Sequence, residues 1–349
     1  MAQQNTIPLE ITDLRLGRNS GDPSLWLPER QCTEALNVDW FLGTLANKRS
    51  GAFNTDTSFV AGGPFTGVIS SLIRWVPEAD ETIAQLWAFD DANPPVVGRL
   101  VLSSQYQVPT MIDALANADA GRNVCGLSLP TSLVLAYDST VNRGHVYDGT
   151  SVRRMGLDTP ATPTGAAMGA GGVSYTRTWR IRYVTISGSD TIRRSEASGV
   201  LTATIAAKLG YTVNRPALIS EGETHWEVEY ADLPGGPFYR AAQIVVATTT
   251  YDDTAATINT ALPLTAEDGT NWPPPSFKYA VSFNAHLLFA GAFETSGGYV
   301  TPKNNRLWWT PPLGASDVGD NERVPTGYFL DLDTYITGMA GPIQGAVYV

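Results

Sequence analysis

Tyr175–Ile186 reads YTRTWRIRYVTI, and its alternation of side chains decides the fold class. The residues of one face are large and apolar: Trp179, Ile181 and Tyr183. Arg180 and Arg182 lie between them and point to the opposite face, since successive side chains of a strand alternate. A period of two, with aromatic and β-branched residues, is typical of a strand. The stretch therefore predicts a central strand of a β-sheet.

Similar short runs follow this segment and are separated by turn residues. They are Thr191–Glu196, Gly199–Ile205, His225–Tyr230, Phe238–Val246 and Thr248–Asp253. About seven short strands in a hundred residues are expected of a small β-sandwich. No Cys–Trp–Cys framework accompanies them, so a fibronectin-III-like sandwich is favoured over an antibody-type domain.

Two stretches of biased composition bracket this region. Thr159–Gly172 (TPATPTGAAMGAGG) reads as a linker, and Asn271–Pro275 (NWPPP) reads as a stiff, extended exit. The predicted boundaries are residues 1–158 for an N-terminal part of the body, 159–270 for an inserted sandwich, and 271–349 for the return to the body.

The flanking regions also read as paired strands. The predicted runs are Val68–Val76, Ile83–Phe89, Arg99–Val108, Leu127–Tyr137, His145–Asp148, Ser151–Met155, Ala280–Phe283, His286–Ala290, Asn305–Thr310, Tyr335–Met339 and Ala346–Val349. Strand pairs at such spacings are typical of a propeller, a sandwich or a barrel. Only short stretches, near Ile112–Ala120 and Ala206–Leu209, permit a helix. The sequence thus predicts an all-β protein.

Composition limits the possible partners. Of 349 residues 16% are charged, and the net charge is −11. This charge argues against tight binding of nucleic acid, which needs many Lys and Arg residues on phosphates. Either it only keeps the chain soluble, or it lines a conduit to which passing DNA does not stick. No signal peptide or membrane-spanning run is predicted, and Cys32 and Cys125 are expected to be reduced, buried thiols of a protein made in the cytoplasm.

No pattern for catalysis or metal binding stands out. His145, His225 and His286 lie far apart and match no metal-binding spacing, and no serine lies in a G-x-S-x-G turn. The acidic pairs at 90–91 and 252–253 could bind Ca²⁺, but solvated turns explain them better. Glu267–Trp272 (EDGTNW) is better explained by an Asp-Gly turn than by a sialidase-type motif. The sequence predicts no enzyme, no cofactor and no metal.

Aromatic and basic doublets are the candidates for a subunit interface. Trp308 and Trp309 must point to opposite faces of a strand, and both packing between sheets and contact with another subunit suit them. Arg153 and Arg154 could face a partner's carboxylates, or they could simply be exposed strand ends.

Several passages resemble, in order along the chain, tail hub and nozzle-type proteins of bacteriophages. They are Asn37–Trp40 (NVDW) with Gly43–Arg49, Val146–Thr150 (VYDGT) with Arg153–Leu157 and Pro160, His286–Gly291 (HLLFAG) with Arg306–Thr310, and Phe329–Asp333 with Ile336–Gly338. Within the middle region, Trp226–Tyr230, Phe238–Arg240 and Thr250–Asp253 resemble the closing strands of fibronectin-III-like domains.

This resemblance implies a β-propeller-like body interrupted by a fibronectin-III-like β-sandwich. It also implies a virion structural protein of a phage tail: a hub, nozzle or head-to-tail ring component that forms a cyclic homo-oligomer around the DNA channel. The expected partners are other tail proteins or portal and adaptor proteins, with DNA only as passing cargo. Two alternatives stay open, a receptor- or glycan-binding tail adhesin and a propeller glycoside hydrolase.

Overall fold

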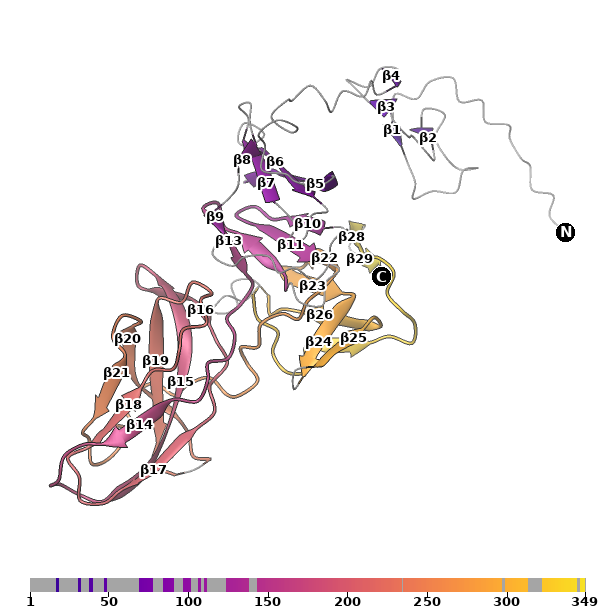
Figure 1. Cartoon of the computed structure of the whole chain (residues 1–349). Helices are drawn as coiled ribbons and strands as arrows, with labels where there is room; N and C mark the ends of the chain where they lie inside the picture. The colour runs from indigo at the N-terminus through magenta and orange to yellow at the C-terminus, as the bar shows by residue number, and fades with distance from the viewer. Residues whose placement is uncertain are drawn as a thin grey trace. The chain divides into compact units, whose positions relative to one another are not determined.

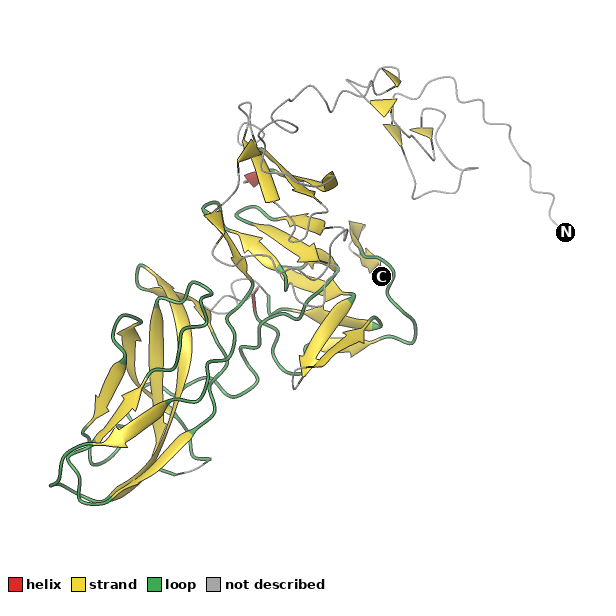
Figure 2. Cartoon of the chain, in the orientation of Figure 1, coloured by secondary structure: helices red, strands yellow, loops and turns green. Residues whose placement is uncertain are grey.

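The computed structural model describes two units, residues 1–62 and 63–349. In the first unit it describes four two-residue strands: β1 (Gly17–Arg18), β2 (Gln31–Cys32), β3 (Val38–Asp39) and β4 (Asn47–Lys48). In the second unit it describes residues 69–77, 84–90, 97–101, 106–107, 110–111, 124–137, 143–233, 235–296, 299–312, 322–343 and 346–348. These residues contain no α-helix and form several sheets, none of them closed (Figures 1 and 2). The protein is all-β, as predicted.

The stretch that decided the fold class is strand β15 (Tyr175–Ser187), the centre of a five-stranded sheet. The other strands of this sheet are β16 (Asp190–Arg194), β17 (Leu201–Ile205), β19 (His225–Ala231) and β20 (Tyr239–Val245). Strand β15 pairs with β19 along one edge, while β16 and β17 share its other edge. The predicted alternation is confirmed, because Trp179, Ile181 and Tyr183 all face an apolar core.

A second, three-stranded sheet covers that core. Its strands are β14 (Thr164–Ala167), β18 (Tyr211–Asn214) and β21 (Thr250–Asp253). Tyr211 of this sheet stacks on Trp179 of the first, with ring centroids 4.7 Å apart. Trp179 and Trp226 are fully buried, and each such side chain contributes about 1.5–3 kcal/mol by leaving water. The segment folds as two sheets packed face to face.

Three further sheets are each built around a four-stranded antiparallel meander. The first contains β5 (Ile69–Trp75), β6 (Gln85–Asp90), β7 (Val97–Val101) and β8 (Tyr106–Gln107). The second contains β10 (Val124–Ser128), β11 (Leu133–Tyr137), β12 (His145–Tyr147) and β13 (Ser151–Arg154), and β9 (Thr110–Met111) adds in parallel. The third contains β22 (Tyr279–Phe283), β23 (His286–Ala290), β26 (Arg306–Trp309) and β27 (Phe329–Asp331). Two hairpins flank the third sheet: β24 (Ala292–Ser296) with β25 (Tyr299–Lys303), and β28 (Ala340–Ile343) with β29 (Ala346–Tyr348).

Strand β11 explains how these sheets hold together. Its sequence LVLAY is buried throughout. Leu133, Leu135 and Tyr137 pack against the first meander, in a cluster with Trp75 and Trp87. Val134 and Ala136 face the other way and join Phe277, Leu287 and Phe289 of the third sheet region. A continuous apolar run is typical of a strand buried on both faces, so the second meander is the middle layer of three.

Several expectations from the sequence are wrong. The Thr159–Gly172 stretch is not only a linker, because strand β14 lies within it and pairs with β18. No strand covers Tyr335–Met339, and Ala206–Leu209 is not helical. Cys125 is exposed on β10, where it points away from the core.

The possible helix at 112–120 and the NVDW–GTLANKR passage lie largely outside the described residues.

Candidate functional site

A cluster of buried, ion-paired side chains lies where the inserted segment leaves and rejoins the meanders. The chain passes through Gly156 on the way in and through Pro273 on the way out. Gly156 has a φ of +72°, and a Cβ atom there would lie 2.8 Å from the Pro273 Cβ and 2.8 Å from the Glu322 carbonyl oxygen. Only glycine allows this backbone conformation without strain and this close approach. The entry and exit segments therefore pack directly against each other.

Glu221 links the insert to the second meander sheet. Its side chain is fully buried. It accepts hydrogen bonds from Arg143, from Arg154 at 3.1 Å and from the backbone N–H of Asp158 at 2.7 Å. Burial raises the pKa of Glu221, an effect that the Arg143 guanidinium opposes. A buried carboxylate is stable only with such partners, so the two arginines hold the insert in place.

A second buried ion pair lies beside it. Arg153 reaches Glu322, whose carboxylate also accepts the backbone N–H of Gly156 at 3.1 Å. Burial alone would raise the pKa of Glu322, but the charge and hydrogen bonds of Arg153 outweigh burial and hold this pKa below its usual range. Arg193 of the insert completes the junction by donating to the carbonyl oxygens of Gly156 and Glu221, at 3.1 and 2.8 Å.

The two arginines proposed for a subunit interface thus lie at this junction. Arg153 is 7% exposed, so its charge is used inside the chain rather than at an exposed strand end. The Arg154 side chain is 30% exposed and bridges to Glu221. Contact of either residue with a second subunit stays a prediction.

The two tryptophans of β26 point to opposite faces of the third meander sheet, as their adjacency requires. Trp308 lies opposite Phe289 and packs toward the core shared with the second meander. Trp309 lies opposite Leu288 on the other face. That face continues through the register pair Leu307 and Leu330, and Leu330 is 52% exposed. We call Leu288, Leu307, Trp309 and Leu330 the outer apolar face; the first three are half-buried, and Leu330 is exposed.

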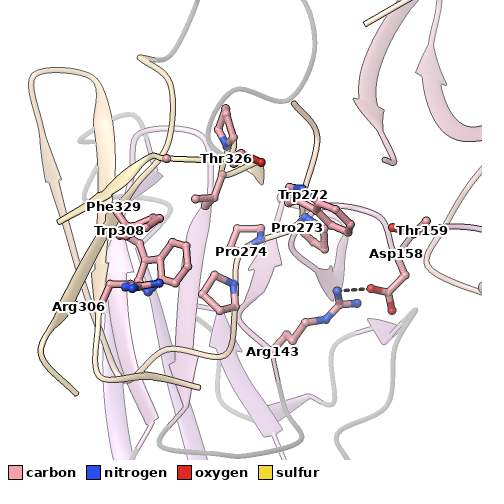
Figure 3. A pocket seen from close by; sticks show the side chains of 14 residues that line it. Arg143, Asp158, Thr159, Trp272, Pro273, Pro274, Arg306, Trp308, Thr326 and Phe329 are labelled. Carbon is pink, nitrogen blue, oxygen red and sulfur yellow. Dashed lines mark hydrogen bonds and ion pairs between the residues drawn. The ribbon is translucent and has the colours of Figure 1, made fainter. Parts of the chain in front are cut away.

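A cavity of about 360 Å³ opens at the same junction (Figure 3). Trp272 and Pro273–Pro275 of the exit segment line it, together with Trp308 and Phe329 of the third sheet. Arg143 and Asp158 contribute a polar end and are joined there by an ion pair of 2.6 Å. Arg306 lies over the Phe329 ring, 3.7 Å from its centroid, and also pairs with Asp331. Cavities with apolar walls and a few placed polar groups are typical of small-molecule sites.

A layer of buried charges on β15 and β19 is a feature that sequence reasoning missed. Arg180 and Arg182 both donate to Glu229, and all three side chains are nearly or fully buried. The segment before Asp268 covers them, and its Ala266 carbonyl oxygen accepts from Arg182 at 2.8 Å. The sequence did carry a signal: R-x-R on one strand and E-x-E (Glu227 and Glu229) on another, at the same period of two.

The histidines and acidic pairs are separate from one another. His145 is buried, and its Nδ1 donates to the Arg143 carbonyl oxygen, 2.9 Å away. Arg177 and Nε1 of Trp179 donate hydrogen bonds to the Asp253 carboxylate, at 2.8 and 2.9 Å. The Thr212 hydroxyl donates to the Asp252 carboxylate. Within the described residues, no group of three or more His, Cys, Asp or Glu side chains could hold a metal ion. The 90–91 pair lies outside the described side chains.

Comparison with known proteins adds no identification. No family model matches the chain, and no curated protein sequence matches it significantly. In the part of the chain that is described, no helix is long and apolar enough to cross a membrane.

Proposed function

We propose that the chain is a structural subunit of a bacteriophage tail, a hub, nozzle or head-to-tail ring component that assembles around the DNA channel. In this proposal the three meander sheets are blades of a propeller-like body, and the insert is its fibronectin-III-like sandwich. The function rests on geometry and interface area, with no bond made or broken.

The observation that carries the proposal is the outer apolar face on the third meander sheet. The second meander sheet buries both of its faces. The third meander sheet buries one face, and on its opposite face Leu330 is about half exposed. Exposed apolar patches of this kind mark interaction surfaces. A neighbouring copy that placed a sheet there would extend the row of packed layers, and repetition of the contact gives a cyclic oligomer.

The junction supports the same role. Two buried contacts of Glu221, with Arg143 and Arg154, join the insert to the second meander sheet, and the Arg153–Glu322 pair joins the segments before and after the insert. Buried pairs fix geometry more than they add stability. A subunit whose insert must project at a defined angle from a ring needs such fixing. The net charge of −11 suits a wall past which DNA slides without binding.

The test is to locate the chain in intact particles. A tagged copy should appear in purified virions in multiple copies per particle by quantitative mass spectrometry, and labelled images should place it in the tail. Its recovery only as free protein in infected cells, with none in particles, would contradict the proposal.

Saccharide binding is the second candidate function, because aromatic and proline rings line the junction cavity. A glycan array that is probed with the whole chain tests this function. A glycoside hydrolase is supported less well. Such enzymes use two carboxyl groups across the scissile bond, whereas Asp158 is the single carboxylate among the cavity's described lining residues. Sugar release that one carboxylate-to-amide change abolishes would establish the hydrolase instead.

A further inference from the structure

The junction cavity combines flat apolar walls with a polar rim. Trp272 is 45% exposed, although it is one of the largest apolar side chains. The rings of Pro273 and Pro274 form the adjoining wall, and Phe329 and Trp308 form the far wall (Figure 3). Aromatic rings bury a large area at low entropic cost when a flat apolar surface packs on them. The C–H face of a pyranose ring is such a surface.

Hydrogen-bonding groups line the same cavity. Oδ1 of Asp158 accepts from Arg143, and none of the described residues donates to Oδ2, while the side chain is 50% exposed. The hydroxyl groups of Thr159 and Thr326 also line the cavity. A cavity lined by both acceptors and donors suits a ligand with several hydroxyl groups, because each hydroxyl both donates and accepts.

The charges at the cavity are already balanced. Arg143, which lines the polar end, is ion-paired with both Asp158 and the fully buried Glu221. Arg306 is paired with Asp331. An anionic ligand such as a phosphate would find no cation in excess here. The ligand that fits is uncharged.

From these observations we infer that the cavity is a binding site for a neutral saccharide, which stacks on Trp272 and bonds to Asp158. The inference is independent of the assembly role, because a subunit can bind sugar whether or not it forms a ring. With one carboxylate held by an arginine, the site binds the sugar and does not cleave it.

The experiment titrates the full chain with methyl glycosides of glucose, galactose, mannose and N-acetylglucosamine, and with maltose and lactose. Tryptophan fluorescence and saturation-transfer NMR report binding. We expect saturable binding of at least one probe in the millimolar range. Trp272→Ala should weaken it about tenfold or more, whereas Trp272→Phe, which keeps an aromatic wall, should retain most of it.

Tyr335→Ala is the matched control, because Tyr335 is an aromatic residue 76% exposed in the same unit but does not line the cavity. It should bind like the unmodified chain. Circular dichroism and unfolding curves verify that each variant is folded. The inference is overturned if no neutral probe saturates the folded chain, if Trp272→Ala binds as well as the unmodified chain, or if glucose 6-phosphate binds more tightly than methyl glucoside. A failure of this kind leaves the virion test unaffected.

Discussion

Arg153 and Glu322 lie 169 residues apart in the chain and form a two-pronged ion pair, with Nη1–Oε2 at 2.6 Å and Nη2–Oε1 at 2.8 Å. The pair joins β13, just before the insert, to a segment that follows the insert. It therefore closes the junction across the whole inserted region. Both side chains are mostly buried, at 9% and 14% exposure, so the pair is screened little by solvent.

Removal of the Glu322 charge should leave the Arg153 guanidinium buried without this ion pair. We expect Glu322→Gln to lower the free energy of unfolding by about 3 kcal/mol, the lower end of the range for broken buried pairs. Urea unfolding at neutral pH measures this change. Asp333→Asn is the control, because Asp333 is exposed, and it should change the unfolding free energy little. An effect of Glu322→Gln no larger than that of the control would show that the ion pair contributes nothing.

His145 should make the protein less stable in acid. Burial, more than any other cause, lowers the pKa of His145 from 6.5 to about 3. Between these values the unfolded chain binds a proton that the folded chain does not, so stability is lost as pH falls from about 6.5 toward 3. One proton corresponds to a slope of about 1.4 kcal/mol per pH unit.

His145→Asn should remove that slope, and urea unfolding at several values between pH 4 and pH 7 measures it. Tyr137→Phe is the comparison, because Tyr137 packs edge-on against His145 and its own hydroxyl has no partner among the described residues. This variant should keep the slope. An unchanged slope in His145→Asn would mean that other groups cause the acid sensitivity.

The buried charge layer gives a third prediction. Arg182 is fully buried and Glu229 is 1% exposed. Arg182→Leu should lower the free energy of unfolding by about 3–5 kcal/mol, since it leaves carboxylates short of a partner. The double change Arg182→Leu with Glu229→Leu should recover part of this loss, because it removes both partners of one contact. Thermal and urea unfolding of the single and double variants check it, and a double variant far less stable than either single one would contradict it.

The outer apolar face gives a fourth prediction, which concerns assembly. Leu330→Asp places a charge on the outer apolar face and should reduce the assembled fraction, since a desolvated unpaired charge opposes association. Sedimentation over a range of concentrations measures the mass of the complexes.

Leu264→Asp is the matched control, because Leu264 is 67% exposed on the insert, away from this face. It should assemble like the unmodified chain. A chain that stays monomeric at every concentration, or equal assembly by both variants, would argue against a contact through Leu330.

Much of the fold could be predicted from single strands. The β15 alternation and the apolar run of β11 each defined a strand, and the apolar face of β15 was assigned correctly. Strand β14 was missed, because TGAA has no apolar pattern and pairs only through its backbone with β18. The strand predicted at Tyr335–Met339 was wrong, since Tyr335 faces solvent rather than a sheet.

The candidate site was far less predictable. The doublets at 153–154 and 308–309 were singled out, but Glu221 and Glu322 were not. A carboxylate in a turn has no periodicity, and nothing local shows that an arginine tens of residues away will reach it. The cavity likewise combines residues from 143 to 329, and only packing brings them together.

The sequence by itself determined the all-β class and the placement of Trp179, Ile181 and Tyr183 in a core, because alternation along a strand is a local property of the backbone. Tertiary structure decided that the arginines between them are buried as well, that Arg153 is paired with Glu322, and that Trp272 shares a cavity with Phe329. These relationships depend on loop closure across long stretches of chain. The sum of all packing interactions determines which long loops close. No single segment of sequence therefore predicts these contacts.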